Sequence, residues 1–96
     1  MTPGGSSHDV MLSAVDREIL LALLVGGADT PRNLSEICDR HHQSVQKRIT
    51  GLQDDGLVIA KGRGVYAISL AGAETARALR RETEIMERLD LDAVES

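Results

Sequence analysis

The chain has 96 residues, enough for one domain. Its composition, with 42% hydrophobic and 27% charged residues, excludes an intrinsically disordered protein. It has one cysteine, one tyrosine, no tryptophan and no phenylalanine, so the core has to be aliphatic and an internal disulfide framework is excluded. The longest apolar run, Ile19–Val25, is too short to cross a bilayer. We therefore expect a cytoplasmic protein, and neither a membrane protein nor an enzyme with a large cavity.

Charge is distributed unevenly along the chain. The formal net charge is −4. The segment Arg32–Arg63 holds six basic and four acidic residues, whereas the segments before and after it each have a net charge of −3. One basic segment in an otherwise acidic protein is typical of a surface that binds an anionic partner.

The N-terminal third predicts a tail and one helix. Residues 1–9 are small and polar, which favours a disordered tail and lacks the basic region of a secretory signal. Ser13 is the expected N-cap of the helix, and Asp16 completes a capping box. Apolar residues then recur at spacings of three and four, which predicts one core-facing side: Val15, Ile19, Leu20, Leu23 and Leu24. The pair Gly26–Gly27 ends this helix.

A second helix is expected before a tight turn. Thr30 is its predicted N-cap, and Pro31 occupies the first helical position, where a missing N–H costs nothing. The helix runs to about Cys38, and we expect it to bury three side chains, those of Leu34, Ile37 and Cys38. The turn covers Asp39–His41.

The third predicted helix, His42–Asp54, has two contrasting faces. Its apolar residues Val45, Ile49 and Leu52 share one face. The opposite face is rich in amides and bases and lacks a ladder of alternating charges: His42, Gln43, Gln46, Lys47, Thr50 and Gln53. Gly56 ends this helix.

The C-terminal part predicts a hairpin and a long helix. The runs Leu57–Lys61 and Val65–Ser69 are β-prone, and Gly62-Arg63-Gly64 between them predicts a tight turn. A last helix, capped by Ser69, is expected to end at about Leu89 or Leu91. Its apolar residues are Leu70, Ala73, Ala76, Leu79, Ile85, Met86 and Leu89.

This order of elements predicts a mainly α fold with a small β-hairpin, that of the winged helix-turn-helix. We expect the DNA-binding domain to cover residues 10–72, followed by a helix over 73–92 and a tail over 93–96. The segment Leu34–Val45 is similar to the helix-turn-helix of MarR-like and ArsR-like regulators, in which a Leu, an apolar residue and a Gly-Leu-Val follow one another at intervals of eleven. Leu34, Val45 and Gly56-Leu57-Val58 match that spacing.

A narrower resemblance lies in the amino-acid sequences of three short segments. Asp39–Gln43, Gly62–Tyr66 and Ser69–Gly72 resemble the phage-repressor-like winged-helix proteins of halophilic archaea and their viruses. The chain departs from the wider pattern at the turn: Asp39 stands where Gly is common, Arg40 where an apolar residue is common, and His41 where Ser or Thr caps the helix.

The resemblance implies a sequence-specific regulator that binds a double-stranded DNA operator, acting as a repressor that occludes a promoter. Glutamine amides suit adenine, arginine and lysine reach guanine or phosphate, and an arginine between glycines suits a wing that grips the backbone or minor groove. The predicted DNA-binding residues are His42, Gln43, Ser44, Gln46, Lys47, Arg48, Thr50, Lys61, Arg63 and Arg32. The alternative is that these are ordinary solvated side chains.

The last helix is the predicted dimerisation element. Leu79, Met86 and Leu89 follow spacings of seven and three, which favours a short helical seam in a homodimer. Glu82 or Thr83 interrupts that stripe. The alternative is that this face packs on the first helix, and both can hold in part.

Other functions find less support. Cys38, His41 and His42 provide half of a zinc site, and only His8 in the tail remains as a further ligand, so we expect no metal and no cofactor. Asp54 and Asp55 are neighbours on a helix end and diverge, and no nucleophile has a recognisable base, so we expect no enzyme. No small-molecule ligand and no membrane contact are expected. The competing function is a winged-helix module that binds protein instead of DNA.

Overall fold

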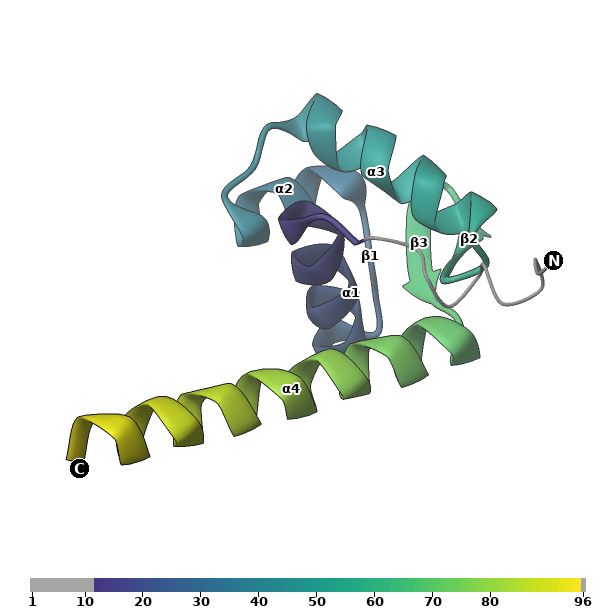
Figure 1. Cartoon of the computed structure of the whole chain (residues 1–96). Helices are drawn as coiled ribbons and strands as arrows, with labels where there is room; N and C mark the ends of the chain where they lie inside the picture. Colours follow the sequence, from purple (N-terminus) through teal and green to yellow (C-terminus); the bar gives the residue numbers. More distant parts are fainter. Residues whose placement is uncertain (1–11, 96) are drawn as a thin grey trace, which may run out of the picture.

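The structure is a computed structural model, which describes the backbone of residues 12–95 and the side chains of residues 12–89. The predicted tail over residues 1–9 lies outside the described part. The elements are α1 (Ala14–Gly26), β1 (Ala28–Asp29), α2 (Pro31–Cys38), α3 (His42–Asp54), β2 (Val58–Gly62), β3 (Val65–Ile68) and α4 (Leu70–Glu95). The predicted mainly α fold with a hairpin is confirmed (Figure 1). α4 continues to Glu95, beyond its predicted end.

Local chemistry sets the helix starts as predicted. The Oγ of Ser13 accepts a hydrogen bond from the Asp16 N–H at 3.1 Å, and the Asp16 carboxylate accepts one from the Ser13 N–H at 3.0 Å. This is the predicted capping box of α1. Thr30 caps α2, with Pro31 in the first helical position.

The three strands form one antiparallel sheet in the order β1-β3-β2. β2 and β3 are the predicted hairpin, with an irregularity in register between Ala60 and Gly62. β1 was not predicted: it pairs Ala28 with Ala67 and Asp29 with Tyr66 of β3. Two residues are too few to show an alternating pattern, so only the tertiary pairing reveals this strand.

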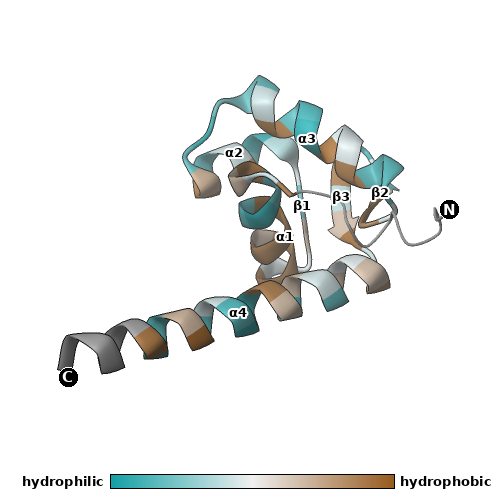
Figure 2. Ribbon diagram, in the orientation of Figure 1, coloured by the Kyte–Doolittle hydropathy of each residue, from teal (hydrophilic) through white to brown (hydrophobic). Residues whose placement is uncertain are grey.

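The core lies where α1, α2, α3, β2 and α4 meet. Its buried residues are all aliphatic: Ile19, Leu20, Leu23, Leu34, Val45, Ile49, Leu52, Val58 and Ala76. Figure 2 shows the outer surface of α3 as largely hydrophilic. No helix within the described residues is long and apolar enough to cross a membrane.

The predicted burial of Ile37 is wrong, because its side chain is 59% exposed. Ser35 is buried instead, and its hydroxyl donates a hydrogen bond to the Arg32 carbonyl at 2.6 Å. With Leu34 and Ser35 both inward, the buried face of α2 is centred between them, and Ile37 lies about 100° away around the helix. Cys38 is half-buried.

Candidate nucleic-acid interface

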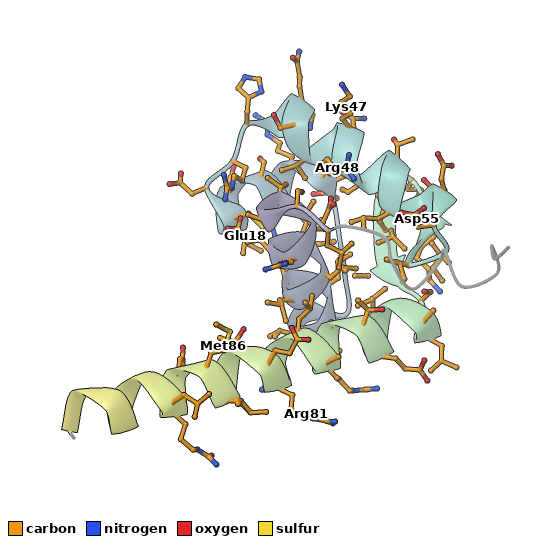
Figure 3. All side chains as sticks on the ribbon, viewed as in Figure 1. Glu18, Lys47, Arg48, Asp55, Arg81 and Met86 are labelled. Carbon is orange, nitrogen blue, oxygen red and sulfur yellow. The ribbon has the colours of Figure 1, made fainter. Side chains whose placement is uncertain are left out.

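α3 lies on the outer surface of the molecule, on the opposite side of α1 from α4 (Figure 1). Val45, Ile49 and Leu52 anchor it in the core. Its other face is therefore open to solvent over its whole length. The predicted contact residues exposed on that face are His42, Gln43, Ser44, Gln46, Lys47 and Thr50. Figure 3 shows Lys47 pointing outward from α3.

The unusual turn residues before α3 fit their positions. Asp39 has φ +54°, a left-handed conformation that aspartate adopts more readily than most residues, and it ends α2 in place of glycine. His41 is the N-cap of α3: its Nδ1 accepts a hydrogen bond from the Gln43 N–H at 3.2 Å. The histidine thus performs the role that Ser or Thr has in related motifs.

Arg48 does not share the outward orientation of Lys47. Its Nε donates to Asp16 at 2.7 Å and its Nη2 at 3.1 Å, and the Asp16 side chain is 1% exposed. Hydrogen bonding to Asp16 raises the pKa of the Arg48 guanidinium. A Cβ on Gly51 would lie 3.3 Å from Nη2, so the glycine leaves room for this guanidinium. Arg48 thus holds α3 onto α1, and its side chain is 40% exposed.

A second ion pair ties the turn before α3 to α1. Arg40 donates from Nε and Nη2 to the two Glu18 oxygens, at 3.0 and 2.9 Å. The hydrogen bond from Arg40 lowers the pKa of Glu18, and both side chains are about 40% exposed. Sequence reasoning missed Asp16, Glu18 and Arg40 as positioning residues. One signal was present: Asp16 lies three and four positions before core residues, on a face where a carboxylate needs a partner.

The other four predicted cations form no ion pair within residues 12–89: Arg32, Lys47, Lys61 and Arg63. All four are exposed. Arg32 of α2 and His42 of α3 line one notch of about 320 Å³, together with Ser35 and Glu36. The starts of the two helices are therefore brought together.

Arg63 lies at the tip of the hairpin. It has φ +57° and Gly64 has φ +76°, so both central residues of this two-residue turn have the positive φ that a type I′ turn requires. The hairpin follows α3 directly, and β2 packs against that helix. Lys61 and Arg63 therefore lie on an element that is fixed relative to α3.

Cys38, His41 and His42 do not form a metal centre. Within the described residues no group of three histidine, cysteine or acidic side chains is arranged to hold an ion. Burial raises the pKa of the Cys38 thiol, and the nearby Glu18 charge adds to that rise. Cys38 is thus a protonated thiol at neutral pH.

No protein-family model and no curated protein sequence matches this chain. Solved structures, in contrast, do resemble this chain. The MarR family transcriptional regulator SPO1453 from Silicibacter pomeroyi DSS-3 superposes with a TM-score of 0.75 at 17% identity, over 94% of this chain and 66% of that one. ZitR, a zinc-responsive MarR family member from Lactococcus lactis, superposes with a TM-score of 0.67 at 19% identity, over 86% of this chain and 62% of that one.

The fold is a winged helix. The identities are low, and the chain spans no more than 66% of the length of these structures, so the likeness establishes the fold. In winged-helix terms, α2 and α3 are the helix-turn-helix, α3 is the recognition helix, and β2–β3 is the wing. The predicted contact residues then lie on the recognition helix, at the start of α2 and on the wing.

Proposed function

We propose that the chain is a sequence-specific double-stranded DNA-binding transcription regulator, which acts in the cytoplasm as a homodimer and represses by occluding a promoter. The observation that carries this proposal is the outward face of α3. It presents three glutamine amides, a histidine and a lysine, and it has no acidic residue before the C-terminal Asp54. A helix of this kind fits the major groove and reads base edges from its first turns.

The wing and α2 supply backbone contacts in this proposal. Lys61 and Arg63 reach phosphates or the minor groove beside the recognition helix, and Arg32 reaches a phosphate at the start of α2. Arg48 is not among the proposed contacts, because Asp16 holds its guanidinium. In a homodimer, two recognition helices about 34 Å apart would read successive major grooves of a two-fold operator.

Base contacts and phosphate contacts have different signatures, which provides the test. Gln46→Ala should weaken binding to the operator by about 1–3 kcal/mol and leave binding to scrambled DNA nearly unchanged. Arg63→Asn removes a charge but keeps a residue that tolerates positive φ, so the wing turn is preserved. It should weaken binding to both DNAs alike and make the dependence on salt shallower. Fluorescence anisotropy measures both effects.

The second candidate is a winged-helix module that binds protein. The exposed apolar side chains of α4 and of the α1–α2 surface favour it. This candidate predicts that Gln46→Ala and Arg63→Asn leave DNA binding unchanged, because a protein-binding module has no specific affinity for DNA. The resemblance to proteins of halophilic archaea and their viruses stays a prediction.

A further inference from the structure

The C-terminal half of α4 carries exposed apolar side chains. Ile85, Met86 and Leu89 are 51%, 65% and 60% exposed. The first half of the same helix packs against α1 and buries Ala73 and Ala76. α4 has 26 residues and α1 has 13, so α4, about 39 Å long, continues well past its packing partner (Figure 1). The C-terminal half of α4 therefore extends past α1, and its own chain leaves the apolar side chains there uncovered.

A shallow apolar groove lies between α1 and α2. It has a volume of about 610 Å³ and is lined by Leu21, Ala22 and Val25 of α1 and by Ile37 and Cys38 of α2. Val25 is 80% exposed and Ile37 is 59% exposed. Figure 3 shows Met86 on the side of α4 toward α1 and α2, and Arg81 on the opposite side. Of the exposed apolar residues of α4, Met86 therefore lies on the side that faces the two helices of the groove.

The width of the apolar arc on α4 indicates two neighbours. Ile85 and Met86 are consecutive, so their side chains point about 100° apart, and Leu89 projects between them. A seam between two helices needs only a narrow stripe, whereas an arc of about 100° is typical of a helix that packs against more than one element. A second α4 accounts for one side of this arc and leaves the other side open.

We propose that in the homodimer the segment Glu82–Leu89 of each protomer lies in the α1–α2 groove of the other protomer, while also packing along the partner's α4. This inference rests on the dimer of the proposed function. Each chain carries both the groove and the helix that fills it, so a two-fold axis makes the contact twice. Met86 and Leu89 alone fall far short of the roughly 800 Å² per partner of a stable interface, and the groove supplies the missing apolar surface.

Charge does not favour this contact. The groove contains two carboxylates, Glu18 and Asp29, and Glu18 is already paired with Arg40. The segment Glu82–Leu89 has three glutamates and one arginine, a net charge of −2. Apolar burial is therefore the main contribution to the proposed contact.

Disulfide cross-linking tests this arrangement directly, because Cys38 is the only cysteine and lines the groove. In Met86→Cys, oxidation should give a covalent dimer on a non-reducing gel, with the Cys38 peptide joined to the peptide that contains position 86. The same variant combined with Cys38→Ser should lose most of that product. Arg81→Cys, on the opposite side of α4, should give little. A dimer in solution that cross-links only through position 86, with Cys38 left free, would overturn the groove contact.

A second pair of variants tests the contact without cysteine chemistry. Val25→Asp places a charge in the groove, and Leu70→Asp places one at an equally exposed apolar residue outside it, 78% against 80%. Both should fold, which circular dichroism checks. Val25→Asp should raise the dimer Kd at least about tenfold, and Leu70→Asp should change it little. Equal Kd values in the two variants, or a monomer at every concentration of the unaltered chain, would contradict the proposal and leave the groove to a small apolar ligand or another protein.

Anisotropy with operator DNA on the same samples separates the two proposals. If cross-linking succeeds and DNA is not bound, the dimer contact stands and the proposed function fails. If a monomer binds operator DNA specifically, the proposed DNA-binding function stands and the groove contact fails.

Discussion

Asp16 connects the start of α1 to the recognition helix. Its buried carboxylate accepts hydrogen bonds from the Ser13 backbone and from two nitrogens of Arg48. A carboxylate so deeply placed needs these partners, because an unpaired buried charge is very costly. Consecutive residues of a helix point about 100° apart, so Lys47 faces solvent while Arg48 reaches Asp16. Two adjacent cations therefore have different roles.

Substituting each of these two cations separates the roles. Arg48→Ala should lower the free energy of unfolding by about 1–3 kcal/mol, because Asp16 loses its charged partner. Lys47→Ala should change it by less than about 0.5 kcal/mol, as is usual at exposed positions, yet weaken DNA binding. Urea unfolding and anisotropy on both variants provide the measurements. The assignment fails if Arg48→Ala is as stable as the unaltered chain and Lys47→Ala binds DNA normally.

The Glu18–Arg40 pair predicts a pH dependence. Its hydrogen bonds lower the folded-state pKa of Glu18 below the ordinary 4.5. The pair therefore contributes stability above about pH 4.5, and that contribution disappears as the pH falls through the lowered pKa. Solvent screening keeps that contribution small. An NMR titration should show the Glu18 midpoint below 4.5, and Arg40→Ala should move it back up. A midpoint that Arg40→Ala leaves in place would refute this coupling.

At the scale of elements, local signals predicted most boundaries. Three helices begin with a side chain that accepts a hydrogen bond from an N–H group three residues later: Ser13, Thr30 and Ser69. Because these contacts are local, the sequence alone is enough to predict them. The partner of Arg48 lies 32 residues away and the partner of Arg40 lies 22 away, so no local pattern reveals that these cations are engaged. The burial of Ile37 was predicted wrongly because the apolar pattern gives no sign that Ser35 is buried, and the buried Ser35 turns the inward face of α2 away from Ile37.

Gly72 shows how closely α4 approaches the wing. A Cβ at this position would overlap the Leu57 carbonyl oxygen and lie 2.8 Å from Ile68. Beside it, the Ser69 hydroxyl donates to the Gly56 carbonyl at 2.6 Å and accepts from the Gly72 N–H at 3.0 Å. The base of the wing is therefore fixed to the start of α4.

Gly72→Ala should destabilise the protein, although alanine favours helices over glycine by about 1 kcal/mol. The added methyl group has to displace backbone, which costs about 1–3 kcal/mol as in other overpacked sites. Gly26→Ala is a matched control in a helix, because its new methyl meets no atom within 4 Å. Thermal unfolding compares the two. A Gly72→Ala variant with a Tm equal to or above that of the unaltered chain would contradict the close approach.

At the scale of the whole molecule, the proposed functions occupy opposite sides. The recognition helix and wing carry Lys47, Lys61 and Arg63 of the proposed DNA contacts, while the groove of α1 and α2 and the C-terminal half of α4 carry exposed apolar residues. Acidic residues dominate the chain outside Arg32–Arg63. This distribution favours an approach of DNA to one face and leaves the other face for a second protomer.

The most direct test of the central claim is fluorescence anisotropy of the unaltered chain with DNA from its own upstream region and with a scrambled fragment, across several salt concentrations. The account predicts a preference of about a hundredfold or more for the upstream DNA. If the four proposed contact cations of each protomer, Arg32, Lys47, Lys61 and Arg63, all contact phosphates, log K should fall with log salt at a slope of about −7 for the dimer. Equal affinity for both DNAs, or no binding at low salt, would contradict a sequence-specific regulator.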